Sequence, residues 1–399
     1  MTRPFRRRVL FLPGFDPMPP RRYRELYRRE GQSQARIRGY DLILEKSACD
    51  NGGWQVRSHF PDGQAHAEFG VLVWSDIVQA SMTGGILETY GRMLRTGWIY
   101  AASGALWRLA RLRRGPVLAA LYPVVMLLAQ LAVAVLIGLL AFAIAGRLAG
   151  FGWLPPIVGM GAGWAVLILA KRQDHRLFAY YLIHDYAFTA DRHGAYAPQL
   201  DQRLSAFADR ILGALRDDCD EVLVIGHSSG AYLAVSAVAD AIRRGRPDSV
   251  PDDGPVLALL TLGQAVPMAS FLPRAQRLRA DLAFLSERPD LFWLDVSAPG
   301  DPCCFALCDP VAVTGAAGAG QRWPLMMSAA FSRTLSQRRQ RALRWRWFRL
   351  HRQYLCAFDR PGDYDYFAIT AGPRRLADRF GHRAHSPGRI ATPVGPGLP

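Results

Sequence analysis

The chain of 399 residues contains little lysine and has few acidic residues to balance its basic ones. Only Lys46 and Lys171 are lysines, so arginine supplies nearly all of a formal net charge of +16. Such a charge indicates a nucleic acid or the anionic face of a membrane as a partner. The length suffices for one large domain or two ordinary ones.

Cysteine is also scarce, and its spacing fits neither a zinc site nor a disulfide framework. The six residues are Cys49, Cys219, Cys303, Cys304, Cys308 and Cys356. We therefore expect a reducing compartment, no metal and no cofactor. The apolar run after the basic start of the chain, over 9–12, is too short for a signal peptide and ends in Pro13-Gly14. Secretion is therefore not expected.

Charged residues are missing from two long stretches, Val117–Ala145 and Leu154–Ala170. Each is long enough to cross a bilayer, and the segment between them is too short for a soluble domain. We predict a transmembrane helical hairpin over 111–172, with a pair of buried core helices as the weaker alternative. Small residues that would allow close approach of the two backbones are Ala134, Gly138, Gly159 and Gly163.

Basic residues flank the hairpin on both sides, and only Arg147 lies in the turn between its helices. The flanking residues are Arg108, Arg111, Arg113, Arg114, Lys171, Arg172 and Arg176. By the positive-inside rule, both flanks face the cytoplasm. We therefore expect an integral protein of a bacterial-type inner membrane, with both termini and the remaining domain in the cytoplasm.

Two further segments combine aromatic residues with arginine, around 93–107 and over 338–349. This mixture is typical of a membrane interface. For the second segment, nucleic acid is conceivable, but beside a hairpin we favour lipid phosphates. For the same segment, a helix face that contacts only solvent is an equally good alternative.

The most informative short stretch is Gly226-His227-Ser228-Ser229-Gly230, which matches G-x-S-x-G. A buried strand is predicted before it and a helix of small apolar residues after it. This is the context in which a serine nucleophile stands on a sharp strand-to-helix turn. We predict Ser228 as the nucleophile, with a plain Gly-Ser turn as the alternative.

Strands alternate with helices along the chain, which predicts an α/β fold with a mostly parallel sheet. Asp301 follows the strand predicted over 291–296, at the edge of the sheet where ligands bind. We expect it to orient the catalytic base. Asp295 and Asp309 are weaker candidates for this acid.

A serine hydroxyl needs a base, which a histidine held by a carboxylate supplies. His351 follows the last predicted strand, over 325–331, and is our candidate. Its rivals are His382 and His385, beside a Pro- and Gly-rich tail over 383–399 that we expect to be disordered.

Two other groups near these motifs have a predicted role. The strand predicted over 9–12 ends in a Gly-containing turn, so the N–H groups of Phe15 and Ser229 are the expected oxyanion donors. A plain Pro-Gly turn is the alternative. His184 and Asp185 are adjacent on a predicted helix and point about 100° apart, so we expect His184 to be structural.

These motifs resemble the α/β-hydrolase superfamily, and within it the fungal-type class 3 lipases. The resemblance rests on the G-x-S-x-G turn, on Leu260–Pro267 with its Gly263-Gln264 pair, and on the order Ser228, Asp301, His351. It covers about 1–76 and 176–372. The sequence departs from the family in the inserted hairpin and in lacking a histidine before Gly14.

The resemblance implies a hydrolase domain in two parts, 1–110 and 173–382, separated by the hairpin. It also implies a serine esterase or lipase that acts on acyl or lipid esters, with membrane lipids and no nucleic acid as partners. The alternative function is a catalytically inactive scaffold of the same fold, which binds a partner or anionic lipid.

Overall fold

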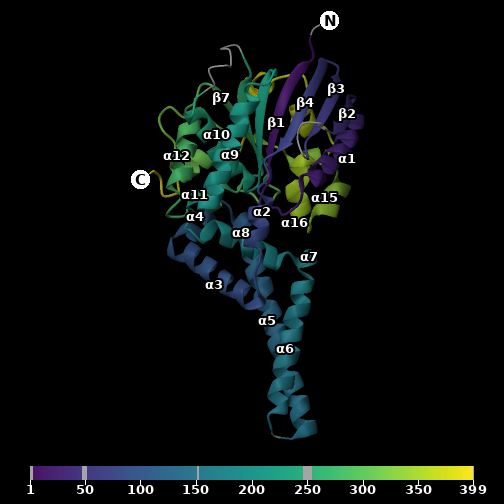
Figure 1. Ribbon diagram of the computed structural model, residues 1–399, viewed down its shortest axis with the longest axis vertical. Coiled ribbons are helices and arrows are strands. Elements are labelled where there is room, and N and C mark those ends of the chain that lie inside the picture. The colour runs from purple at the N-terminus through teal and green to yellow at the C-terminus, as the bar shows by residue number, and fades with distance from the viewer. Residues whose placement is uncertain (1–2, 47–51, 151, 246–253, 399) are drawn as a thin grey trace.

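The computed structural model describes residues 3–46, 52–150, 152–245 and 254–398. Cys49 lies outside this part. An eight-stranded sheet forms the centre of the molecule, in the order β2-β3-β4-β1-β5-β6-β7-β8 (Figure 1). The strands are β1 (Phe5–Leu12), β2 (Asp41–Lys46), β3 (Trp54–Phe60), β4 (Gly63–Val71), β5 (Glu221–His227), β6 (Val256–Leu262), β7 (Leu291–Ser297) and β8 (Leu325–Ser328).

The sheet is mixed but mostly parallel, which confirms the predicted α/β class. The strands β4, β1, β5, β6, β7 and β8 all run parallel to one another. Near one edge of the sheet, β3 runs the other way and pairs antiparallel with both β2 and β4. All residues of β5 are buried, because helices cover both faces of the sheet.

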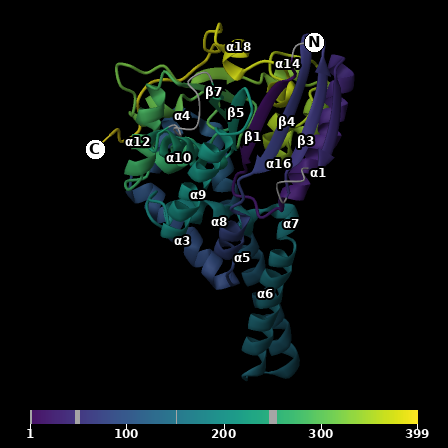
Figure 2. The same cartoon turned by 45° about the horizontal axis from the view of Figure 1, so that its top comes forward.

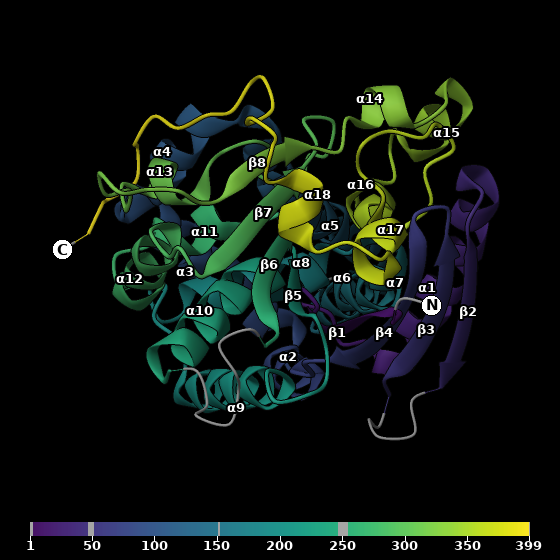
Figure 3. The same ribbon diagram turned by 90° about the horizontal axis from the view of Figure 1, so that it is seen from above.

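Two layers of helices produce these two covered faces (Figure 3). On one face pack α9 (Pro198–Ala214), α10 (Gly230–Arg243) and α12 (Gln276–Ser286). On the other pack α1 (Pro20–Arg38), α17 (Tyr366–Ala371) and α18 (Leu376–Phe380). The buried aromatic residues Tyr27, Trp54 and Phe69 contribute to the second core.

A helical hairpin, α5 (Arg114–Ala149) and α6 (Leu154–Arg172), projects from the body of the protein (Figures 1 and 2). Both helices are long and apolar enough to span a membrane. Large apolar side chains on them are exposed, including Leu136, Leu139 and Met160, so they are not core helices. Arg147, expected in the turn, lies in the last turn of α5.

The two hairpin helices approach each other at the small residues predicted for this purpose. A Cβ on Gly138 would lie 2.9 Å from the carbonyl oxygen of Gly159, and one on Gly163 would lie 2.9 Å from that of Ala134. Larger side chains would force these backbones apart. The predicted packing of the hairpin is therefore confirmed.

Short helices fill the space between the hairpin and the carboxyl edge of the sheet. They are α2 (Ser75–Ser81), α3 (Ile86–Ala102), α4 (Ala105–Leu112), α7 (Asp174–Leu177) and α8 (Ala179–Ala190). The outer face of α3 exposes Leu87, Leu94 and Trp98, the last to 73%. These residues recur at helical spacing, so α3 presents one apolar side away from the body.

The last strand, β8, is shorter than predicted, because it ends at Ser328 and not at residue 331. Two short helices precede it, α11 (Val266–Ser270) and α13 (Pro310–Thr314). The segments that follow it include α14 (Phe331–Thr334), α15 (Gln337–Leu343), α16 (Trp347–His351) and the 3-10 turn η1 (Arg352–Leu355). The arginine-rich run over 338–349 is divided between α15 and α16.

The tail predicted to be disordered is instead bound to the sheet domain over 383–398. The Ser386 N–H donates to the carbonyl of Met326 in β8, and Ile390 pairs with Cys308 as an isolated bridge. Arg389 also forms a 2.6 Å ion pair with the buried Asp309. Backbone hydrogen bonds and this ion pair hold a segment whose apolar content is too low to predict order.

Candidate active site

Ser228 stands on the turn between β5 and α10, with a φ of 59° that is uncommon for a residue with a side chain. The turn requires glycine on both sides. A Cβ on Gly226 would lie 2.6 Å from the Gly230 carbonyl oxygen, and one on Gly230 would lie 2.4 Å from that of Leu12. The predicted strand, sharp turn and helix are thus present, and they lift Ser228 to the carboxyl edge of the sheet.

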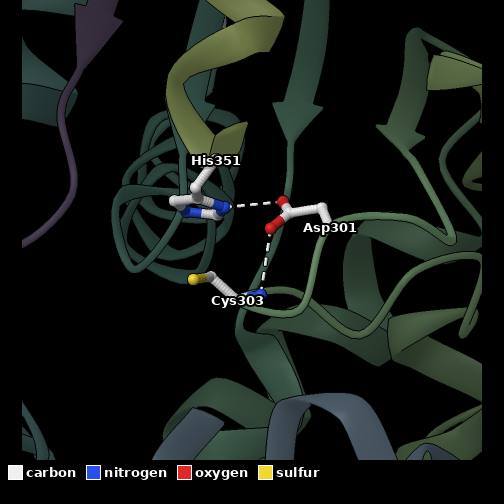
Figure 4. Close-up of side chains that lie close together, drawn as sticks. All are labelled: Asp301, Cys303 and His351. Carbon is white, nitrogen blue, oxygen red and sulfur yellow. Dashed lines mark hydrogen bonds and ion pairs between the residues drawn. The ribbon is translucent and has the colours of Figure 1, made fainter. Parts of the chain in front are cut away.

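Asp301 and His351 come together from segments far apart in the chain (Figure 4). Asp301 follows β7 and His351 ends α16, and the His351 Nδ1 lies 2.7 Å from the Asp301 Oδ2. Burial raises the pKa of Asp301, but the interaction with His351 and the N–H of Cys303 outweigh it, so this pKa stays below its ordinary value. An ionised Asp301 favours the tautomer with the proton on Nδ1, which leaves Nε2 as the basic nitrogen.

His351 lines a cavity that Ser228 also lines, and its other ring nitrogen is not engaged. His351 Nε2 is buried and has no hydrogen-bond partner among the described residues. The cavity has a volume of about 300 Å³. Within the described part of the chain no hydrogen bond joins Ser228 Oγ to Nε2. Catalytic hydrogen bonds of this kind often form fully only when substrate is bound.

Three further residues hold this arrangement in place, and the sequence reasoning missed their roles. His227 Nε2 lies 3.1 Å from the backbone oxygen of His351, and burial lowers the pKa of His227 to about 3. A neutral His227 can donate to that oxygen. Tyr354 donates its hydroxyl to Asp301 Oδ2 at 3.0 Å. Gly263, with a φ of 53°, makes room for this ring, because a Cβ there would lie 2.5 Å from Tyr354.

The predicted oxyanion donors lie beside the serine, but one is engaged. A Cβ on Gly14 would lie 2.9 Å from that of Ser228, so the turn after β1 touches the nucleophile. The Phe15 N–H donates to Ser229 Oγ at 2.8 Å. An oxyanion would have to replace this hydroxyl as the acceptor. The hydroxyl of Tyr181 also donates to the Phe15 carbonyl, which fixes the turn.

The rival candidates lie elsewhere in the fold. His385 Nδ1 accepts from the Met326 N–H at 3.1 Å, on the outer side of β8. His382 lines a separate cavity with arginine side chains. Asp295 accepts from Thr261 inside the sheet, and Asp309 pairs with Arg389. None of these four candidates lines the cavity that contains Ser228.

The His184 side chain contacts two groups of the protein, as we expected for a histidine with a structural role. Its Nδ1 lies 3.1 Å from the backbone oxygen of Ser81 and 3.3 Å from a guanidinium nitrogen of Arg92. It does not line the cavity, whereas the adjacent Asp185 does. The two neighbours therefore have different environments.

Most of the cavity wall is apolar or aromatic. It includes Phe178 and Tyr181 from the region of α8, Phe348 from α16, and Pro116, Ala119 and Ala120 from the first turns of α5. The cavity therefore extends from the nucleophile to the base of the hairpin.

Asp301, Cys303 and His351 also form the one cluster in the described residues whose donor atoms are close enough to share a metal ion. Burial and the charge of Asp301 raise the pKa of the Cys303 thiol well above its ordinary value, which disfavours the thiolate that binds metals. Asp301 and His351 already bond to each other. The donor set therefore fits an acid–base pair better than a metal centre.

The chain was also compared with known proteins. No family model, no curated protein and no solved structure matches it.

Proposed function

We propose that the protein is a membrane-anchored serine hydrolase of the α/β-hydrolase type, which cleaves acyl esters. One observation carries the proposal. A buried Asp301–His351 pair, with Nε2 unpartnered among the described residues, faces the same apolar cavity as a serine on a strained strand-to-helix turn. A nucleophile, a base and an orienting acid are the three parts that acyl transfer requires.

In the proposed reaction, Ser228 Oγ attacks the acyl carbonyl while His351 Nε2 takes its proton. The imidazolium, stabilised by Asp301, returns this proton to the leaving alcohol. Water, activated by the same nitrogen, then hydrolyses the acyl-enzyme. The N–H groups of Phe15 and Ser229 stabilise the oxyanion, once the Ser229 hydroxyl has released the first of them.

The properties of the hairpin support the proposal that the substrate comes from a bilayer. Its exposed apolar side chains need a lipid environment, and its first turns form part of the cavity wall. The apolar side of α3 would lie in the headgroup region, with the flanking arginines at the level of the lipid phosphates. We place the sheet domain on the cytoplasmic side by the positive-inside rule. An acyl chain could then enter the cavity directly from the adjoining leaflet.

The test is active-site labelling with a fluorophosphonate, together with hydrolysis of p-nitrophenyl butyrate, on the full chain in detergent. The wild type should label and hydrolyse, whereas Ser228→Ala should lose labelling and about 10³-fold or more in kcat/KM. Ser332→Ala, an exposed serine on α14, is the matched control and should behave as the wild type. A folded wild type that does neither would favour the inactive scaffold.

A further inference from the structure

A second carboxyl group, that of Asp185 on α8, lines the cavity beside the proposed catalytic pair. No described residue donates a hydrogen bond to its side chain. Asp16, which lines the same cavity, differs sharply from it. The Asp16 carboxylate accepts from the Tyr23 hydroxyl at 2.7 Å and from the Met18 N–H at 3.0 Å. Asp16 is thus satisfied by the protein, and Asp185 is not.

Three tyrosines that line the cavity with Asp185 have their hydroxyl groups engaged elsewhere. The hydroxyl groups of Tyr100 and Tyr181 donate to backbone carbonyls, and that of Tyr232 is hydrogen-bonded to a threonine side chain. Burial among these rings raises the pKa of Asp185 to about 7, although the charge of His351 opposes this. A carboxyl group in such a wall is costly, whether it is ionised or neutral, as long as it stays unpaired.

Asp185 is also not needed as the acid of the proposed triad. His351 Nδ1 already bonds to Asp301, and Nε2 must remain available to the nucleophile. The half-buried Asp185 therefore lines the space that the substrate would occupy, and a group in that space can supply the partner that it lacks among the described residues.

We propose that Asp185 determines substrate specificity by accepting a hydrogen bond from a hydroxyl or ammonium group on the ester. This inference rests on the proposed hydrolase function and names its substrate class. The ester combines an apolar chain, which fits the aromatic and aliphatic wall, with one hydrogen-bond donor inside the cavity. A site built around such a polar contact discriminates strongly against the analogue that lacks it, because its own polar group is then left unpaired.

The test uses the full chain in detergent and p-nitrophenyl esters of octanoic acid, each carrying a hydroxyl or an ammonium group at one carbon from C3 to C7. A second series places the same groups on the alcohol part of octanoate esters. The quantity measured is kcat/KM for each substituted ester divided by that for the plain ester. The wild type should favour at least one substituted ester by roughly 10- to 100-fold, as expected for a hydrogen bond to a charged group.

Two variants and one control separate the role of Asp185 from differences in intrinsic ester reactivity. Asp185→Leu should abolish the preference and raise kcat/KM for the plain ester. Asp185→Asn keeps an oxygen acceptor, so it should retain part of a preference for hydroxyl but lose one for ammonium. Asp191→Leu, an acid at the end of the same helix that does not line this cavity, should leave the ratios unchanged.

The outcomes distinguish this inference from the function on which it rests. Ser228-dependent hydrolysis with equal wild-type ratios across both series would overturn the role of Asp185 and leave the hydrolase intact. Ratios that stay unchanged in Asp185→Leu would overturn it as well. Absence of any Ser228-dependent hydrolysis or labelling would overturn both proposals.

Discussion

The sheet domain and the hairpin use apolar residues and glycine for different purposes. In β5 every residue is buried by helices on both faces, whereas in α5 large apolar side chains such as Leu136 point outward. Gly226 and Gly230 permit a strained turn that presents a reactive group, while Gly138 and Gly159 only let two backbones touch. Similar compositions thus occur in two settings. The sheet domain covers its own apolar side chains, whereas the hairpin, long and apolar enough to span a membrane, leaves them exposed.

Removing the proposed base, His351, should have the largest effect on activity of the three changes. This change affects the sheet domain and leaves the hairpin as it is. His351→Ala should lower kcat/KM for p-nitrophenyl butyrate by about 10³-fold or more, because it removes the imidazole that Asp301 holds at Nδ1 beside the cavity. His385→Ala should stay within a few-fold of the wild type, since that ring is held at β8. If instead His385→Ala, or a corresponding change at His382, removed activity and His351→Ala did not, the assignment of the base would be wrong.

Substitution of Gly230, in the strained turn at Ser228, should have the second largest effect. Gly230→Ala would place a Cβ 2.4 Å from the backbone oxygen of Leu12, which neither backbone can avoid without moving. We expect a loss of about 3 kcal/mol or more in the free energy of unfolding, together with loss of labelling at Ser228. Gly213→Ala on α9 meets no atom within 4 Å and is the matched control. Denaturant titration of both variants would show whether the turn is as constrained as the distances imply.

Replacing Gly138 in the hairpin should have the smallest effect of the three changes, and this effect should be confined to the hairpin. Gly138→Val would press against the carbonyl of Gly159, with an expected cost of about 1–3 kcal/mol from overpacking. The midpoint of thermal unfolding in detergent should fall, while the kcat/KM of the folded protein stays near the wild type. Gly146→Val, with open space around it, should change neither quantity. Equal behaviour of the two valine variants would mean that the helices do not pack through this contact.

Local patterns were enough to predict the parts of the fold that depend on neighbours in the chain. The turn at Ser228 and the hairpin are each encoded by neighbouring residues in the chain, as was the strand β5 before that turn. The pairing of Asp301 with His351 followed only from chain order and sheet topology, and the structure places the two groups 2.7 Å apart. Its role in catalysis stays a prediction.

The features that sequence reasoning missed all depend on contacts between distant segments. Nothing near His227 indicates that its ring reaches the backbone of His351, and nothing near Ser386 indicates a hydrogen bond to β8. The environment of Asp185 is set by rings from several helices at once. The sequence shows no difference in the surroundings of Asp185 and the adjacent His184, although among the described residues only the His184 side chain has hydrogen-bond partners.

The hairpin has a consequence for anyone who wishes to make a soluble form of this protein. Pro116, Ala119 and Ala120 belong both to α5 and to the cavity wall, so deleting the whole hairpin would open the pocket to water. Leu127, about two turns further on, is fully buried against the core under α8. A shortened version should therefore retain α5 through Leu127 and rejoin the chain at the matching level of α6. The hairpin is, in this sense, also a wall of the cavity.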